Sequence, residues 1–160
     1  MTTKWMVLAL VAALAAPAAA AEMSAEQVSR SVEDAFVKHL EAGDVPGILA
    51  LYTDDAHVIW PGQGEESYDK KTLEPMVRDF VAAMKNGKLT LKKVNARYLG
   101  KDYVVNSAHW EETSTGAGGK TETHTLRTTE IYQRKNGKWL FVVDHASMGM
   151  PAETAGGETH

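Results

Sequence analysis

The first part of the chain carries apolar residues at helical spacing. Between Ser24 and Glu41 they recur every three or four positions, which predicts a helix with one apolar stripe. The members of this stripe are Val28, Val32, Ala35, Phe36 and Leu40. Ser24 and Gln27 form a capping-box start, and Gly43 supplies a stop. One amphipathic helix is therefore expected at the start of the domain.

Two more helices and one short strand are predicted downstream. Asp44 caps a short helix that ends at Asp54-Asp55. Its apolar side is formed by Ile48, Leu49, Leu51 and Tyr52. A short strand is predicted from His57 to Trp60, where Pro61 ends it. A third helix is expected from Lys71 or Thr72 to Lys85.

After the third helix the period changes to the alternation of β-strands. Four long segments rich in Val, Thr, Tyr and Trp predict strands at Leu89–Leu99, Tyr103–Thr113, Glu122–Arg134 and Trp139–Ser147. Asn136-Gly137 is the sharpest hairpin signal among the breaks between them. Helices followed by an antiparallel meander indicate an α+β fold, with the helices packed on one face of a sheet.

The first 21 residues have the pattern of a secretory signal peptide. Lys4 precedes an apolar run from Trp5 to Ala15, and Pro17 and several alanines follow. The run is shorter than the roughly 20 residues that span a bilayer, although an uncleaved anchor is the alternative. We expect cleavage before Glu22, a periplasmic or secreted protein, and no membrane contact after cleavage.

The rest of the chain has the size and composition of one domain. About 140 residues remain, and we assign 22–150 to the domain and 151–160 to a disordered tail. The sequence has no cysteine, which excludes disulfides, a thiol nucleophile and thiolate metal sites. The net charge is −4 and the basic residues are scattered, so no nucleic-acid partner is expected. The histidines lack metal-ligand spacing, and we expect no metal and no cofactor.

Two stretches resemble the nuclear-transport-factor-2-like (NTF2-like) superfamily. They are GDVPGILALYTDDAHVIWPG from Gly43 and NGKWLFVVDHASM from Asn136. The second is similar to the calcium/calmodulin-dependent kinase II association domain, in which a Gly-Lys-Trp turn leads into a strand ending in His-x-Ser. The resemblance implies a cystatin-like cone, in which a curved antiparallel sheet packs against three N-terminal helices. It also implies a conical pocket and a homodimer formed through the outer face of the sheet.

The same superfamily includes SnoaL-like cyclases and ketosteroid isomerase. The resemblance places the isomerase's general base, oxyanion-hole tyrosine and protonated carboxyl at Trp60, Phe36 and Thr129. Trp60 cannot act as a base, and Phe36 cannot donate to an enolate. We therefore do not expect the isomerase reaction by that mechanism.

Several residues are candidates for ligand binding or chemistry. The position of Thr129 in the resemblance implies that its face of the strand lines the pocket, and Arg127 shares that face. An arginine there favours an anionic ligand, and an internal salt bridge is the alternative. Asp144 and His145 are candidate acid/base residues on opposite faces of the last strand, and which face lines the pocket is open.

Three aromatic residues are further candidates for the pocket wall, with core packing as the alternative. They are Tyr52, Trp60 and Trp110. Three functions follow from these residues. The first is an exported small-molecule-binding domain without chemistry. The second is an enzyme of isomerase, dehydratase or hydrolase type using Asp144 or His145 with Arg127. The third is an oligomerisation domain whose pocket has no function.

Overall fold

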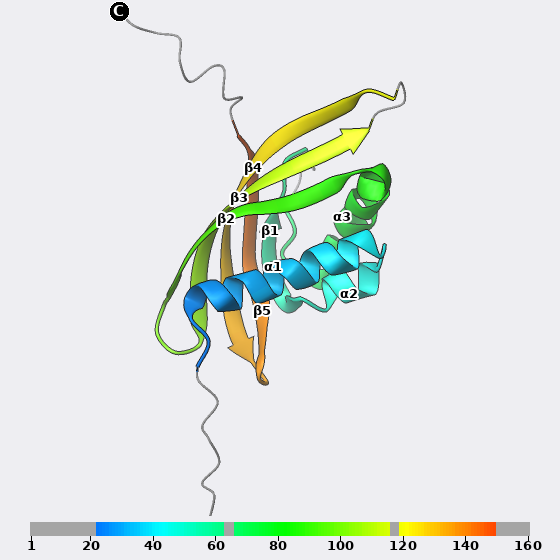
Figure 1. Ribbon diagram of the computed structural model, residues 1–160. Helices are drawn as coiled ribbons and strands as arrows, with labels where there is room; N and C mark the ends of the chain where they lie inside the picture. The colour runs from blue at the N-terminus through cyan, green and yellow to red at the C-terminus, as the bar shows by residue number, and fades with distance from the viewer. Residues whose placement is uncertain (1–21, 63–65, 116–118, 150–160) are drawn as a thin grey trace, which may run out of the picture.

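Five strands form one curved sheet, and the helices lie inside its curve (Figure 1). The computed structural model describes residues 22–62, 66–115 and 119–149. The predicted signal peptide and the predicted tail lie outside these residues. The helices are α1 (Ala25–Glu41), α2 (Val45–Leu49), α3 (Lys70–Ala83) and the short 3-10 turn η1 (Met84–Asn86). This arrangement confirms the predicted α+β cone.

The sheet has the strand order β1-β5-β4-β3-β2. Its strands are β1 (Tyr52–Ile59), β2 (Lys88–Tyr98), β3 (Tyr103–Thr115), β4 (Thr121–Lys135) and β5 (Lys138–Met148). β2 to β5 form the predicted antiparallel meander, and β1 joins its edge parallel to β5. Asn136 and Gly137 both adopt positive φ, at 53° and 76°, as the predicted two-residue hairpin requires.

Local signals at the helix ends act as the sequence predicts. Ser24 and Gln27 form a reciprocal capping box at the start of α1. Gly43 follows the helix with φ of 66°, a conformation that favours glycine. Asp44 caps α2 by accepting a hydrogen bond from the Gly47 amide at 2.9 Å. These contacts fix the direction in which α1 crosses the sheet.

The boundary between α2 and β1 differs from the prediction. The helix ends at Leu49, and Tyr52 and the Asp54-Asp55 pair belong to β1. Tyr52 pairs with Phe141 of β5, and the two rings stack with centroids 4.7 Å apart. Helical spacing made Tyr52 a helix residue in the prediction, but pairing with a strand far away in sequence outweighs this local preference.

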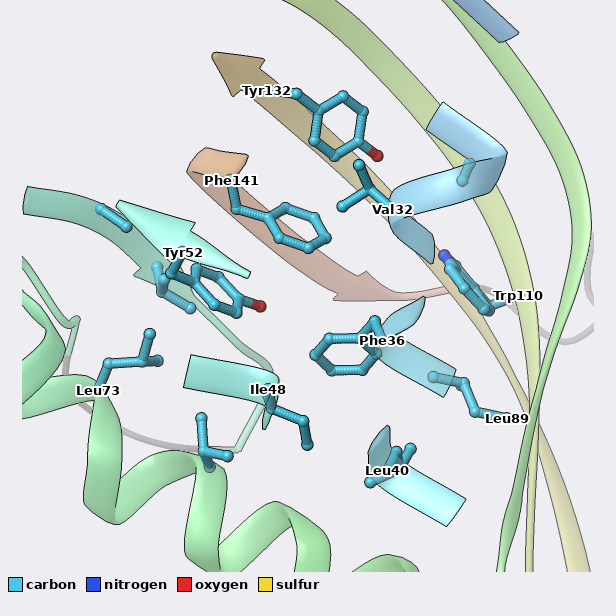
Figure 2. Packing of buried hydrophobic residues seen from close by; sticks show 14 of the residues in the cluster. Val32, Phe36, Leu40, Ile48, Tyr52, Leu73, Leu89, Trp110, Tyr132 and Phe141 are labelled. Atoms are coloured by element: carbon cyan, nitrogen blue, oxygen red, sulfur yellow. The ribbon is translucent and has the colours of Figure 1, made fainter. Parts of the chain in front are cut away.

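The core fills the space between α1 and the concave face of the sheet (Figure 2). Val32, Phe36 and Leu40 lie along one side of α1 and are buried, as the stripe predicts. Tyr132 and Phe141 approach from β4 and β5, and their rings meet edge to face with centroids 5.1 Å apart. Burial of these side chains holds the helix against the sheet.

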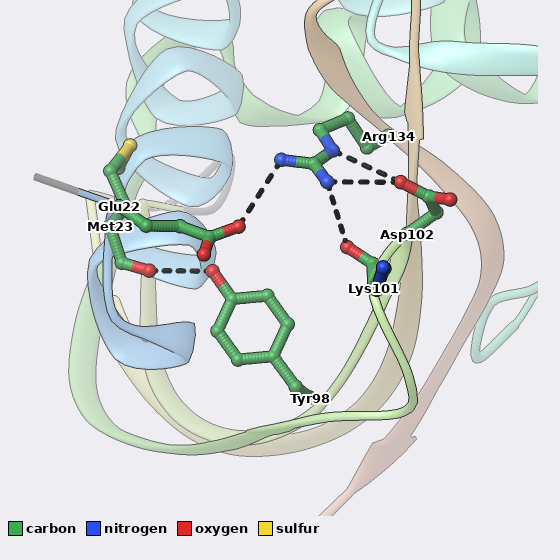
Figure 3. Close-up of polar contacts among 6 residues, drawn as sticks. All are labelled: Glu22, Met23, Tyr98, Lys101, Asp102 and Arg134. Carbon is green, nitrogen blue, oxygen red and sulfur yellow. Dashed lines mark hydrogen bonds and ion pairs between the residues drawn. The ribbon is translucent and has the colours of Figure 1, made fainter. Parts of the chain in front are cut away.

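Polar contacts attach the start of the domain to β2, to β4 and to the turn between β2 and β3 (Figure 3). Arg134 donates to Asp102 at 3.1 Å and to Glu22 at 3.4 Å. The Tyr98 hydroxyl donates to the Met23 carbonyl at 2.5 Å. The residues directly after the predicted cleavage site therefore already contact the domain. Among the described residues, no helix combines the length and apolarity needed to cross a membrane.

Candidate functional site

A cavity of about 560 Å³ lies between the sheet, α1 and α3. The strands supply alternate residues to it, because every second side chain points inward. On β4 these are Leu126, Thr128 and Glu130, and on β5 they are Asp144 and Ala146. The cavity lies between the sheet and the helices, which is where the resemblance implies a pocket.

Aromatic rings form one wall of the cavity. Phe36 from α1, Trp60 from the end of β1 and Phe80 from α3 all line it. The Trp60 and Phe80 centroids are 5.3 Å apart, and Phe36 lies 6.3 Å from each of them. Trp110 of β3 also lines the cavity, and its indole N–H is held by the Thr128 hydroxyl at 3.2 Å. Packed rings with few rotatable bonds make this wall well defined.

Asp144 presents a carboxyl group to this cavity. The residue is 6% exposed, and its Oδ2 atom accepts hydrogen bonds from the Tyr52 hydroxyl at 2.7 Å and the Trp60 indole at 2.9 Å. Burial raises the pKa of Asp144, and the two donors oppose this rise because they favour the charged form. Tyr52 and Trp60 thus hold the carboxyl group in one orientation.

A second polar cluster lies beside Asp144 and combines two buried acids. Glu33 of α1 is 2% exposed and Glu130 of β4 is 1% exposed. The Tyr132 hydroxyl donates to Glu33 Oε1 at 2.5 Å, and the Asn106 amide donates to Glu130 Oε2 at 2.8 Å. Asn106 also lies 3.2 Å from the Tyr132 hydroxyl, so the two acids share one network.

Burial is the main reason why both acids favour the protonated form. It raises the pKa of Glu33 to about 8, and the nearby Asp144 charge adds to the effect. It raises the pKa of Glu130 to about 10, with further contributions from Glu33 and Asp144. Closely spaced carboxyl groups in a cavity resist simultaneous ionisation. The site therefore combines protonated carboxyl groups with Asp144, whose hydrogen bonds favour ionisation.

The mouth of the cavity is polar and the lining is short of positive charge. Asp79, Glu112, Ser114 and His124 are the polar residues away from the buried acids and Thr128. Among the described residues, the lining includes no lysine and no arginine. No group of three or more histidine, aspartate or glutamate side chains in the described part of the chain is arranged to hold a metal ion.

The structure brings three of the predicted residues to the cavity and places Tyr52 directly behind it. Asp144, Trp60 and Trp110 line the space. Tyr52 is fully buried and reaches the site through its hydroxyl group, which contacts Asp144. The alternative that these aromatic residues belong to the core also holds in part, since Tyr52 and Trp110 are members of the hydrophobic cluster.

The predicted face of β4 is wrong. Arg127 and Thr129 are exposed on the outer face of the sheet, opposite Leu126, Thr128 and Glu130. The prediction took the inward face from the resemblance at Thr129, and a shift of one residue exchanges the two faces of a strand. The resemblance placed a carboxyl group at Thr129, where this chain has none. The next residue, Glu130, is the carboxyl group that points inward.

The same alternation shows which face of β5 lines the cavity. Asp144 faces the cavity, and His145 is exposed on the outer face. In the sheet, His145 pairs with Thr129. A role for His145 or Arg127 inside the cavity is therefore excluded by their position, because neither side chain can reach a ligand through the sheet.

Sequence reasoning missed Glu33, Glu130 and Asn106. A signal was present for Glu33, which lies four residues after buried Ser29 and three before Phe36 and so falls within the apolar stripe. A polar residue within such a stripe is uncommon unless it is paired. For Glu130 the signal was its alternation with Leu126 and Tyr132, the larger apolar residues of β4.

Comparisons with known proteins agree with this geometry. A structure from Xanthomonas campestris, assigned as a candidate calcium/calmodulin dependent protein kinase II association domain, is 22% identical with a TM-score of 0.72, covering 89% of this chain and 99% of that one. A candidate dehydratase of the NTF2-like family from Streptomyces avermitilis is 15% identical with a TM-score of 0.68, covering 79% and 97%. The association domain of C. elegans CaMKII is 15% identical with a TM-score of 0.65, covering 76% and 94%.

The TM-scores show a shared fold, and together with the match to a SnoaL-like family model they place the chain in the NTF2-like superfamily. Among curated proteins, none matches the chain significantly. The model of the SnoaL-like domain matches residues 30–152, which is most of the chain and contains every residue of the cavity. On this evidence, the chain belongs to the SnoaL-like domain family.

Proposed function

We propose that this protein binds a small organic molecule inside the cone. The observation that carries the proposal is the cavity itself, whose volume of about 560 Å³ is in the usual range for small-ligand sites. Its aromatic wall would bury an apolar body, and the carboxyl groups of Glu33, Glu130 and Asp144 would orient it. The prediction of an anionic ligand depended on Arg127 in the pocket. Because Arg127 lies on the outer face, nothing supports that prediction.

Two tryptophan variants on adjacent residues test the proposal. Ala146 lines the cavity and Ser147 belongs to the other face of β5. Ala146→Trp should fill the cavity, whereas Ser147→Trp should leave it open. Native mass spectrometry of gently purified protein should then detect a bound small molecule in the wild type and in Ser147→Trp only. Equal occupancy in a folded Ala146→Trp variant would refute a ligand site in the cone.

Acid/base catalysis is the second candidate function, and the arrangement of Asp144 and Glu130 favours it. Burial raises the pKa of both groups, but the two hydrogen-bond donors to Asp144 oppose the rise there, so Asp144 would accept a proton and protonated Glu130 would donate one. Such a pair suits isomerisation or dehydration. An activity of this kind should be lost in Asp144→Asn and in Glu130→Gln and kept in His145→Ala. Full activity in Asp144→Asn would exclude this assignment.

We further propose that the protein acts after export. The support is the leader-like sequence before Glu22, together with the contacts that Glu22 and Met23 make with the domain. Mass measurement of protein recovered from the periplasm or medium should give a chain that begins at Glu22, to within a residue or two. Recovery of the uncut chain in the membrane fraction would instead support the anchor.

A homodimer through the outer face of the sheet is also proposed. Val105, Ile131 and Val143 pair across neighbouring strands on this face and are half-buried. A second copy would cover this apolar row. Sizing by light scattering should give a dimer that Ile131→Lys converts to a monomer, and an unchanged dimer would place the interface elsewhere. A dimer that binds no small molecule would favour the third function, an oligomerisation domain.

A further inference from the structure

The charges around the cavity are not balanced by the protein. Three buried carboxyl groups from three different elements line it, those of Glu33, Glu130 and Asp144. Within the described part of the chain, no lysine or arginine lines the same space. Buried carboxyl groups are usually paired with a cation or fully satisfied by hydrogen-bond donors. The three groups therefore lack the counter-charge that would permit them all to ionise.

Glu33 and Asp144 also each have one oxygen that accepts no hydrogen bond from the described residues, whereas Glu130 has the Thr128 hydroxyl beside it as well as Asn106. The partners of Glu33 all contact Oε1, Asn106 contacts Oε2 of Glu130, and both donors to Asp144 contact Oδ2. The remaining oxygens are not enclosed by protein, since the fully enclosed unpaired side-chain atoms in the described residues belong to Thr53 and Asn106. Two carboxyl oxygens on nine-tenths-buried side chains, one of Glu33 and one of Asp144, thus remain accessible in the lining of the cavity.

The aromatic wall suits a cation as well as an apolar body. Ring faces attract positive charge within about 6 Å of their centroids, and most strongly when water is excluded. Phe36, Trp60 and Phe80 lie 5.3 to 6.3 Å from one another and line the same cavity as the three acids. The Trp60 indole also contacts Asp144, so this ring joins the aromatic wall to the acidic group.

We propose that the ligand is a primary amine on an apolar, aromatic-sized body, with its ammonium group bound by Glu33, Glu130 and Asp144. An ammonium group has three N–H donors and no acceptor, so it can donate to the ionised carboxylate of Asp144, to Glu33 after Glu33 loses its proton, and to the carbonyl oxygen of protonated Glu130. Its single charge would replace the counter-charge that the lining lacks. This inference rests on the proposed function, because it names the class of molecule that the cavity binds.

The amine should bind with release of a proton. The groups beside Glu33 and Glu130 are Asp34, Asp144, the Tyr132 hydroxyl, the Asn106 amide and the Thr128 hydroxyl, and none of them is a cation. Burial keeps the pKa of Glu33 near 8, and an ammonium group beside it would lower that value. About one proton should therefore leave the site for each amine bound near neutral pH.

Three probes that share one ring system test the inference. They are 2-(1-naphthyl)ethylamine, 2-(1-naphthyl)ethanol and 1-naphthylacetate, which are cationic, neutral and anionic at pH 7. Isothermal titration of the whole protein should show the amine binding about tenfold or more tightly than the alcohol, and the carboxylate most weakly. Titration of the amine in buffers with different heats of ionisation should reveal the released proton.

Conservative variants separate charge from packing. Asp144→Asn and Glu33→Gln keep an oxygen for the existing donors and should reduce amine affinity about tenfold, with little change for the alcohol. Arg127→Gln, on the outer face, is the control and should change neither. These ratios compare probes on the same variant, so a general loss of stability cannot imitate them.

The results distinguish failure of the amine inference from failure of the proposed function. Equal binding of amine and alcohol, or tighter binding of the carboxylate, would overturn the amine inference and leave the small-molecule cavity standing. Absence of proton release on binding of the amine would also overturn it. Failure of all three probes to bind at about 1 mM would overturn both the inference and the proposed function.

Discussion

The buried acids should make the protein less stable as the pH rises through neutrality. Glu33 and Glu130 have folded-state pKa values raised by burial to about 8 and about 10, against 4.5 for a solvated glutamate. Between these limits the folded state binds protons that the unfolded state has released. The free energy of unfolding must therefore decrease with pH in this range. The contribution is complete below about pH 4.5 and is lost progressively above it.

The magnitude follows from the number of protons involved. A group that is protonated only in the folded state changes the free energy of unfolding by about 1.4 kcal/mol per pH unit. Two such groups give about 3 kcal/mol per unit between about pH 5.5 and 7.5. Asp44, Asp54 and Asp69 have lowered pKa values and the opposite sign, but they act below this window. A total change of about 5 kcal/mol would be a large part of the stability of a domain.

Urea unfolding at several pH values measures this slope directly. Glu33→Gln and Glu130→Gln keep hydrogen-bond acceptors for Tyr132 and Asn106 and should each reduce the slope by about half. Glu26→Gln removes a carboxylate from an exposed position of α1 and should keep the wild-type slope. A wild-type stability that is flat or rises between about pH 5.5 and 7.5 would refute the assignment of Glu33 and Glu130 as protonated groups.

Three further changes test the packing around the site. Gly47→Ala would place a methyl group against the His39 ring and against the Asp44 carboxylate that caps α2, so it should lower the free energy of unfolding by about 1 to 2 kcal/mol, and by less when His39→Ala removes one of these two contacts. Gly137→Ala, at φ of 76°, should cost about 1 kcal/mol in thermal unfolding. Phe36→Ala should cost about 3 to 5 kcal/mol in urea unfolding; a loss below 1 kcal/mol would show that its ring is not core packing.

Much of the fold could be predicted because its signals are local. The capping box at Ser24, the glycine stop after α1 and the Asn136-Gly137 turn each depend on a few adjacent residues, and all three appear in the structure. The four long strands follow from alternation over ten or more residues. The start of β1 could not be read in this way, because Tyr52 is placed by Phe141, a residue almost 90 positions later.

The candidate site was predicted less well because a strand has two faces and periodicity alone does not say which is inside. On β5 the sequence leaves Asp144 and His145 as alternatives, and the structure selects Asp144. On β4 a one-residue error exchanged Thr129 for Glu130. Glu33 was missed because acidic residues are expected on the solvent side of a helix, whereas this one is paired with Tyr132 inside.

Indole NMR signals give the most direct test of a ligand cavity in the cone. Trp60 and Trp110 line the cavity, whereas Trp139 packs against Tyr98 and Arg134 away from it. On titration of ¹⁵N-labelled protein with 2-(1-naphthyl)ethylamine, the Trp60 and Trp110 indole N–H signals should shift together and saturate, while the Trp139 signal stays in place. A shift confined to Trp139, or no saturable shift of Trp60 and Trp110, would contradict binding in the cone.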